Sequence, residues 1–183
     1  IGAALYYDAS VDDARLTLAN ARGAHEAGAE GVSHAAVVGF RRSRGQGAPV
    51  QDCLNPDGPE VGVRAHAILN ATGPWCDTLR LLADPDAAPR LRPTKGVHVM
   101  VPRERVGNRH GITFRSPVDG RVMFVLPWGS LTYIGTTDTE FRGDPGSARA
   151  DLADVQYLLA SANVLFPDAK LELDDVVSTW AGV

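Results

Sequence analysis

The stretch RVMFVLPWGSLTYIGTTD, residues 121–138, decides the fold because it contains two strand-like runs and the turn between them. Residue types that favour strands dominate both runs, and Gly129 and Ser130 separate them. A two-residue loop of this kind favours an antiparallel hairpin in which Trp128 faces Leu131. The stretch therefore predicts an antiparallel sheet.

The register of this hairpin predicts which side chains share a face. Counting back from the turn places Met123 opposite Thr136 and Arg121 opposite Asp138. One face then carries a guanidinium and a hydroxyl, which together suit recognition of a phosphate or a carboxylate. An alternative is a cross-strand ion pair between Arg121 and Asp138 on a solvated face. A second alternative is a bulge at Pro127 that shifts the register by one residue.

Working outward from the hairpin, the pattern predicts a mixed α/β (α+β) protein. Further strand-like runs come before it at residues 91–102 and 111–116, and an apolar stripe after it predicts a helix over residues 151–166. The N-terminal half has a helix signal from residue 11, and the polar, Gly- and Pro-rich residues 41–59 favour a hairpin tip or a surface loop. Its other expected elements are strands at residues 1–10, 32–38 and 61–70, the last followed by a turn.

His98 is the one polar ring in the strand-like stretch TKGVHVMVP, residues 94–102. Side chains alternate along a strand, so His98 shares a face with Gly96 and Met100, opposite to the valines. A glycine inside a strand often marks the close approach of a ligand or of another backbone. The pattern alone leaves two readings open, a histidine satisfied inside the core and a histidine that faces a ligand.

Composition excludes several classes of function. A formal net charge of -4 gives no general attraction for nucleic acid, and no span is long enough to cross a bilayer. The two cysteines, Cys53 and Cys76, provide neither a disulfide framework nor a paired zinc motif, so we expect free thiols. The five histidines lack metal-ligand spacing, so we expect no metal site. The chain also lacks the GxGxxG loop that signals a dinucleotide site.

Five segments together resemble the middle of the FAD-dependent glycerol-3-phosphate dehydrogenases, flavoenzymes that pass electrons to quinone. The resemblance covers nearly the whole chain. In order, the segments are YYDASVDDARLTLANA (6–21), LNATGPWCD (69–77), RPTKGVHVMVPRERV (92–106), DGRVMFVLPWGSLTYIGTTDTEFRGDP (119–145) and DDVVSTWAGV (174–183).

The resemblance implies a two-part architecture. Residues 1–10 would be a strand of the substrate domain, and residues 11–82 would be part of a Rossmann-like FAD-binding domain. Residues 83–183 would form a substrate-binding antiparallel β-sheet domain flanked by helices, including the helix at 151–166. The family's GxGxxG loop would precede Ile1, and an arginine that helps to hold phosphate would follow Val183, so we expect the chain to be a central fragment.

Roles for individual residues also come from the resemblance. His98 matches the histidine of the family's KG.H motif, a candidate catalytic base or substrate ligand. Arg121 and Thr136 match positions that line the substrate pocket. The positions that match contacts to the dinucleotide are Val37, Ala71, Thr72 and Gly73.

The activity implied is oxidation of sn-glycerol 3-phosphate to dihydroxyacetone phosphate by hydride transfer to FAD, with quinone as the electron acceptor. A cytoplasmic protein with peripheral contact to the inner face of the cell membrane is implied in the same way. Two alternatives stay open: a related FAD-dependent amine or hydroxy-acid oxidoreductase, and an isolated fragment that is a non-catalytic module and retains no FAD.

Overall fold

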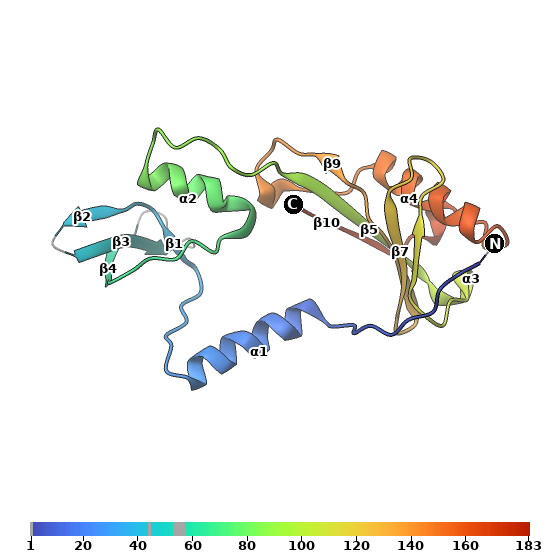
Figure 1. The fold of residues 1–183 in the computed structure, drawn as a ribbon, viewed down its shortest axis with the longest axis horizontal. Helices are drawn as coiled ribbons and strands as arrows, with labels where there is room; N and C mark the ends of the chain where they lie inside the picture. Colours follow the sequence, from blue (N-terminus) through green and yellow to red (C-terminus); the bar gives the residue numbers. More distant parts are fainter. Residues whose placement is uncertain (1, 44, 53–57) are drawn as a thin grey trace. The chain divides into compact units, whose positions relative to one another are not determined.

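The computed structural model describes residues 2–43, 45–52 and 58–183 (Figure 1). Contacts along the chain group it into two units, Ile1–Leu69 and Asn70–Val183. Both units mix helices with antiparallel strands, which confirms the predicted fold class. No pair of described strands is parallel, so the described part of the first unit does not contain the parallel ladder of a Rossmann sheet.

The first unit contains one long helix and a small sheet. Helix α1, Asp13–Glu26, is capped at its N-terminus by Asp12, whose carboxylate accepts a hydrogen bond from the backbone N–H of Arg15. The sheet has the order β1-β3-β2, and β4 also pairs with β3. Its strands are β1 (Ala35–Val37), β2 (Arg41–Ser43), β3 (Gly45–Asp52) and β4 (Val61–Ala65).

Two predictions for this unit can be compared with the structure. The strand expected at residues 1–10 was wrong, because residues 2–10 have no regular structure and their apolar side chains, such as that of Tyr7, are exposed. Strand-forming residue types alone did not suffice here, since no described strand pairs with this segment. The polar stretch at 41–59 contains a β2–β3 hairpin, which agrees with the hairpin alternative.

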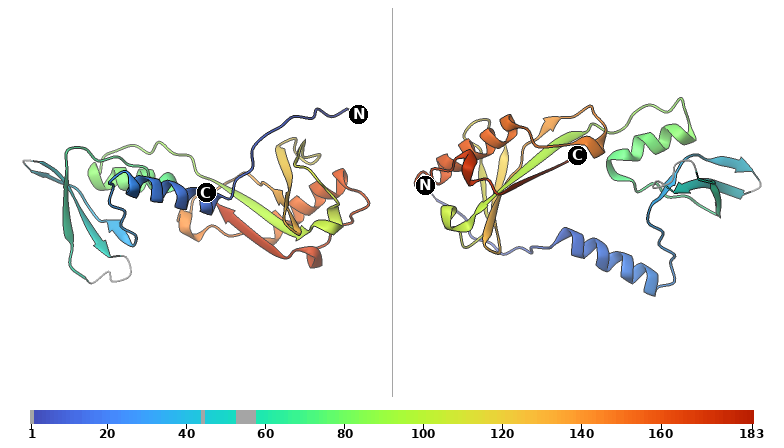
Figure 2. Two further views of the ribbon diagram at one scale, coloured as in Figure 1. Left: turned by 90° about the horizontal axis from the view of Figure 1, so that it is seen from below. Right: turned by 180° about the vertical axis from the view of Figure 1, so that it is seen from behind.

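The second unit is built on a six-stranded antiparallel sheet with the order β10-β5-β8-β7-β6, in which β9 also pairs with β5 (Figures 1 and 2). Its strands are β5 (Thr94–Pro102), β6 (Ile112–Arg115), β7 (Val122–Trp128), β8 (Leu131–Gly135), β9 (Thr139–Glu140) and β10 (Ser178–Gly182). The remaining elements are η1 (Gly73–Trp75), α2 (Cys76–Ala83), α3 (Arg103–Val106), η2 (Pro145–Ser147), α4 (Leu152–Leu165) and η3 (Leu173–Asp175).

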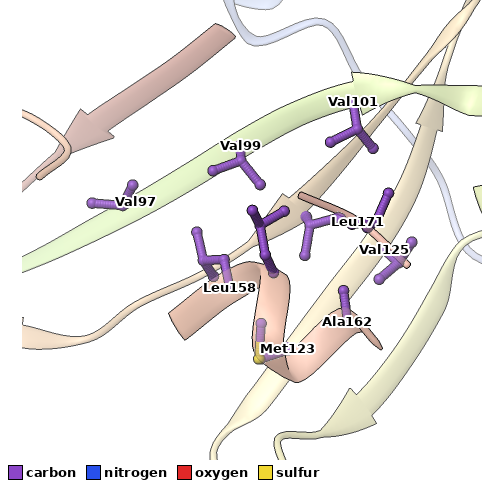
Figure 3. Packing of buried hydrophobic residues seen from close by; sticks show 10 residues of the cluster. Val97, Val99, Val101, Met123, Val125, Leu158, Ala162 and Leu171 are labelled. Atoms are coloured by element: carbon purple, nitrogen blue, oxygen red, sulfur yellow. The ribbon is translucent and has the colours of Figure 1, made fainter. Parts of the chain in front are cut away.

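Helix α4 covers one face of this sheet. It begins with a capping box in which the side chains of Asp151 and Asp154 accept hydrogen bonds from each other's backbone N–H groups. Figure 3 shows Leu158 and Ala162 of α4 across from the valines of β5, and all of these side chains are fully buried. Each buried aliphatic side chain of the size of valine or leucine contributes about 1.5–3 kcal/mol through the hydrophobic effect. The face that α4 covers therefore holds the core of the unit.

The unit boundary falls after Leu69, which is earlier than the predicted domain boundary between residues 82 and 83. Local contacts explain why α2 groups with the second unit. The indole of Trp75 donates a hydrogen bond to Asp144, at 3.3 Å. The carboxylate of Asp77 accepts hydrogen bonds from the backbone N–H groups of Arg90 and Leu91, each at 2.8 Å. These bonds attach η1 and α2 to the segments that enter and leave the large sheet.

Candidate active site

The face of the large sheet opposite to α4 carries His98. Val97, Val99 and Val101 point into the core, so the alternation of the strand turns His98 to the other side, as the sequence predicts. The ladder places Trp180 of β10 on one side of His98 and Gly135 of β8 on the other. Phe124 of β7 lies opposite Gly135 in turn. A row of residues therefore crosses four strands on one face, with His98 in the middle.

Neighbouring side chains hold the imidazole of His98 in one orientation. The indole of Trp180 stacks on it with 5.1 Å between ring centroids and an interplanar angle of 17°. The ring of Tyr133 meets it edge-on at 5.8 Å. On the β8 side, the imidazole lies across Gly135, where a Cβ atom would stand 2.5 Å from Nε2 of His98. The absence of a side chain at residue 135 is what allows this position of the ring.

The imidazole of His98 has no hydrogen-bond partner among the described residues. Burial lowers the pKa of His98 below its usual value near 6.5. Within the part of the chain that the structure describes, no hydrogen bond to either ring nitrogen of His98 occurs, and its ring contacts are aromatic. Burial therefore favours the neutral form of the imidazole, and no described protein group uses its lone pair.

Thr136 lies on the same side of β5 as His98. Its hydroxyl oxygen is 2.8 Å from the position that a Cβ atom of Gly96 would occupy, and Gly96 faces the same way as His98. The hydroxyl donates a hydrogen bond to the carbonyl of Thr137, at 3.0 Å, so its lone pairs remain available to a ligand. The structure thus brings two of the predicted substrate-site residues to one face.

Arg121 lies elsewhere, and the predicted face shared by Arg121 and Thr136 was wrong. The hairpin register itself is confirmed, since Trp128 pairs with Leu131 and Pro127 with Thr132 without a bulge. However, β8 ends at Gly135, so alternation no longer fixes the side on which Thr136 lies. The guanidinium of Arg121 lies over the ring of Tyr157 on α4, 5.3 Å from its centroid, on the covered side of the sheet.

The alternative ion pair between Arg121 and Asp138 also differs from the structure. Nε of Arg121 donates instead to the carboxylate of Asp119, at 2.8 Å, and the backbone N–H of Arg121 donates to the same carboxylate. Asp119 in turn accepts a hydrogen bond from the hydroxyl of Tyr157. Arg121 therefore stabilises the turn before β7 and its contact with α4, and the candidate site consists of His98 and Thr136 with their neighbours.

Sequence reasoning missed Trp180, Tyr133 and Gly135 as parts of this site. Tyr133 and Gly135 stood within the predicted hairpin, but the sequence contains no signal that the hairpin lies next to β5. Trp180 is 82 positions from His98, and only the pairing of β10 with β5 brings the two rings together.

Replacing Gly135 by alanine tests the fit between β8 and the imidazole. The new Cβ would collide with the ring of His98, so we expect a loss of about 1–3 kcal/mol in the free energy of unfolding and a displaced imidazole. Urea denaturation and the NMR signals of the His98 ring measure the two effects. Gly182→Ala on β10 is the matched control, because nothing lies within 4 Å of its added Cβ, and it should change stability by less than about 0.5 kcal/mol. Equal stability of the two variants would contradict this packing.

With this geometry in place, the comparison with known families is decisive. All of residues 1–183 match the family model described as FAD dependent oxidoreductase. The chain belongs to this family of FAD-dependent oxidoreductases. FAD is thus the cofactor of the family, as the sequence resemblance implies.

Similar proteins within the FAD-dependent oxidoreductases are named as oxidases or dehydrogenases of glycerol 3-phosphate. The alpha-glycerophosphate oxidase of Enterococcus casseliflavus is 39% identical over 188 residues, and the aerobic glycerol-3-phosphate dehydrogenase of Staphylococcus haemolyticus is 36% identical over 185 residues. Each match covers 100% of this chain but 30% and 33% of the relative, so the chain spans about a third of their length. These names confirm the resemblance to glycerol-3-phosphate dehydrogenases.

A solved structure gives the same result. The glycerol-3-phosphate dehydrogenase from Bacillus halodurans, determined in complex with FAD, matches with a TM-score of 0.87 and 38% sequence identity. The match covers 93% of this chain and 34% of that chain.

The turn at residues 70–73 fits a role beside the dinucleotide of an FAD-dependent oxidoreductase. Asn70 holds the turn, because its side-chain oxygen accepts hydrogen bonds from the backbone N–H and the hydroxyl of Thr72. Gly73 has a φ of +56°, and nothing lies within 4 Å of the position that a Cβ atom would occupy there, so a ligand can approach its backbone closely. Ala71 and Gly73 are exposed. The residues present are compatible with a cofactor contact through the backbone.

Val37, the other residue matched to the dinucleotide site, lies in β1 of the first unit and is partly buried. Its backbone pairs with Val50 of β3. The turn at residues 71–73 belongs to the second unit. Both cofactor assignments remain predictions.

Other possible functional features lie outside this face. Two hollows of about 510 and 470 Å³ are lined by residues of α4 and η3 and by residues around α3, and neither includes His98. Among the described residues, no group of three or more His, Cys, Asp or Glu residues is arranged to hold a metal ion. No helix in the described ranges is long and apolar enough to span a membrane. Cys76 is a free thiol, whereas Cys53 lies outside the described residues.

Proposed function

We propose that this chain is the central part of a flavoprotein that oxidises sn-glycerol 3-phosphate to dihydroxyacetone phosphate with FAD as cofactor. The observation that carries the proposal is the imidazole of His98 on the sheet face that α4 leaves uncovered, with the hydroxyl of Thr136 on the same side and burial favouring the neutral form of the ring. Family membership and the names of the similar proteins support the choice of cofactor and substrate.

The proposed chemistry divides the work between cofactor and protein. Oxidation of a secondary alcohol removes a hydride from its carbon and a proton from its hydroxyl, and it leaves a carbonyl. FAD, when bound, supplies the oxidant that takes the hydride. His98 takes the hydroxyl proton at a ring nitrogen, because an imidazole whose pKa lies below about 6.5 is unprotonated at neutral pH. Thr136 accepts a hydrogen bond from the substrate with its free lone pairs.

Anaerobic reduction of the flavin tests the substrate class. The full-length protein loaded with FAD is mixed with sn-glycerol 3-phosphate, with glycerol, and with an amine or another hydroxy acid. We expect bleaching of the flavin absorbance by sn-glycerol 3-phosphate and little bleaching by glycerol. Bleaching by the amine or the hydroxy acid, with none by sn-glycerol 3-phosphate, would instead favour the related oxidoreductase. Flavin absorbance that purifies with the 183-residue chain would argue against a non-catalytic module.

The electron acceptor and the location of the protein are further parts of the proposal. We propose quinone as the acceptor and a cytoplasmic protein with peripheral contact to the inner face of the cell membrane. The similar proteins bear the names dehydrogenase and oxidase, so oxygen is the competing acceptor. Reoxidation of the reduced protein by a soluble quinone analogue, faster than by oxygen, is the expected result, and co-sedimentation with anionic vesicles tests the membrane contact.

Substitution of Arg121 tests the correction made to the site. Because its guanidinium contacts Asp119 and Tyr157 on the covered side of the sheet, Arg121→Ala should leave the KM for sn-glycerol 3-phosphate within about twofold. The variant should lose about 1 kcal/mol of stability through the lost ion pair and the lost cation–π contact. Steady-state kinetics and urea denaturation measure both effects. A KM raised by an order of magnitude or more at unchanged stability would return Arg121 to the substrate site.

A further inference from the structure

The indole of Trp180 is the largest side chain in contact with His98, and it is not a core residue. Trp180 is 42% exposed and belongs to β10, one of the two strands at the ends of the sheet order among the described residues. Its backbone pairs directly with that of His98, and its ring stacks on the imidazole at 5.1 Å. The ring contacts of Trp180 on that face are with His98 and Tyr133.

We propose that Trp180 is a positioning residue for His98, whose indole fixes the imidazole against the backbone of β8 and keeps water from one side of the ring. This inference rests on the role of His98 in the proposed function. The indole of Trp180 on β10 stacks on the imidazole from one side. On the other side, Gly135 of β8 has no side chain, so the imidazole lies directly against the backbone of β8. Rotation of the imidazole would require Trp180 to move.

The groups that face His98 explain what loss of the indole would change. On β10 these are Trp180 with Ser178 and Gly182. The neighbours on β8 are Gly135 and Tyr133, and those on β5 itself are Gly96 and Met100. Tyr133 is the one titratable group in this set. Burial accounts for the lowered pKa of His98, with no charged partner in the described residues. Removal of the indole readmits water, so the pKa of His98 should rise toward 6.5.

An NMR titration of the full 183-residue chain tests the proposal without FAD or substrate. The ring signals of His98 are assigned by their loss in His98→Gln, and their pH dependence is compared between the wild type and Trp180→Leu. We expect the midpoint of the His98 titration to move to higher pH in Trp180→Leu. In Trp180→Phe, which keeps a ring to stack on the imidazole, the midpoint should stay at its wild-type pH. Because Trp180→Phe preserves most of the packing, its titration can still overturn the proposal where Trp180→Leu does not fold, and the kinetic comparison below supplies the second readout.

Trp128→Leu is the matched control. Trp128 is 41% exposed on the same sheet face, and its ring centroid is 6.1 Å from that of Tyr133. The ring contacts of His98 are with Trp180 and Tyr133 and do not include Trp128. Its replacement should leave the midpoint of His98 unchanged. An unchanged midpoint in Trp180→Leu, a midpoint near 6.5 in Trp180→Phe, or an equal shift in Trp128→Leu would each overturn the proposal.

Kinetics of the full-length protein give a second readout. Misplacement of the imidazole should lower kcat by up to about 100-fold in Trp180→Leu with KM changed much less, and the acid limb of the pH profile should move upward. A protein that does not turn over sn-glycerol 3-phosphate would refute the proposed function and leave the titration result standing. Normal turnover with an unmoved titration would refute the role of Trp180 alone.

Discussion

Substitution of His98 by glutamine should lower kcat/KM for sn-glycerol 3-phosphate by about 100-fold to 10,000-fold in the full-length protein, the range attributed to a general base. Glutamine keeps the polar end and much of the volume of the side chain but accepts no proton at neutral pH. Stopped-flow measurement of flavin reduction isolates the step at which the proton leaves. His110→Gln, at an exposed loop position of the same unit, is the control and should reduce its flavin at the wild-type rate.

The pH dependence of this step has a defined sign. Because burial lowers the pKa of His98, the rate should rise with pH up to a midpoint below about 6.5 and stay level above it. The free energy of unfolding depends on the same group. It is highest above about pH 6.5 and decreases as the pH is lowered from there toward the folded-state pKa of His98. Wild-type flavin reduction in His98→Gln, or an acid limb that persists in this variant, would remove His98 as the base.

Replacement of Lys95 by methionine should cost about 3 kcal/mol in the free energy of unfolding, the largest stability effect that we expect from a single polar contact in this chain. Nζ of Lys95 is 2.5 Å from the carboxylate of Asp154 and 3.1 Å from that of Asp151, and it also donates to the carbonyl of Arg149. Lys95 and Asp154 are both buried. Removal of the ammonium would leave the Asp154 carboxylate without its cation between β5 and α4.

Urea denaturation of Lys95→Met, of Lys95→Met with Asp154→Leu, and of Arg142→Met measures this effect. The double variant should recover part of the loss, because no buried charge remains without a partner. Arg142 pairs with Glu140 at 3.0 Å in an exposed position, so its variant should lose less than about 1 kcal/mol. Equal losses in Lys95→Met and Arg142→Met would show that the buried pair is not a structural anchor.

The pH dependence expected of this anchor also follows from its contacts. The hydrogen bond to Asp154 raises the pKa of Lys95, while burial opposes it. The stabilisation is therefore complete below the usual lysine value of about 10.4 and disappears as the pH rises through the higher folded-state pKa. Hydrogen bonds from the backbone N–H of Asp154 and, to a smaller extent, from Lys95 lower the pKa of Asp151. The contribution of Asp151 to the free energy of unfolding is therefore lost as the pH falls below about 3.9.

Local alternation predicted the parts of the site that lie within strands. The valines of β5 face the core and His98 faces away, because a period of two leaves a strand with one buried face no other choice. The register of the β7–β8 hairpin followed from its two-residue turn. These are short-range relations, and the sequence contains all the residues that determine them.

The rest of the site depends on contacts between distant segments. Arg121 lies on the covered face with Met123, as the hairpin register predicts, and there it contacts Asp119 and Tyr157 of α4. Thr136 reached the face of His98 because the ladder of β8 ends one residue earlier. Trp180 became a neighbour of His98 only through the pairing of the last strand with β5. No local pattern encodes the placements of Thr136 and Trp180.

A crystal structure of the full-length protein with FAD and either sn-glycerol 3-phosphate or dihydroxyacetone phosphate tests the central claim most directly. We expect the oxygen on C2 of the ligand within about 2.6–3.2 Å of a ring nitrogen of His98, on the sheet face that α4 leaves uncovered. A ligand whose C2 oxygen contacts a different base, with the imidazole of His98 still confined between Trp180 and Gly135 and out of reach, would contradict it.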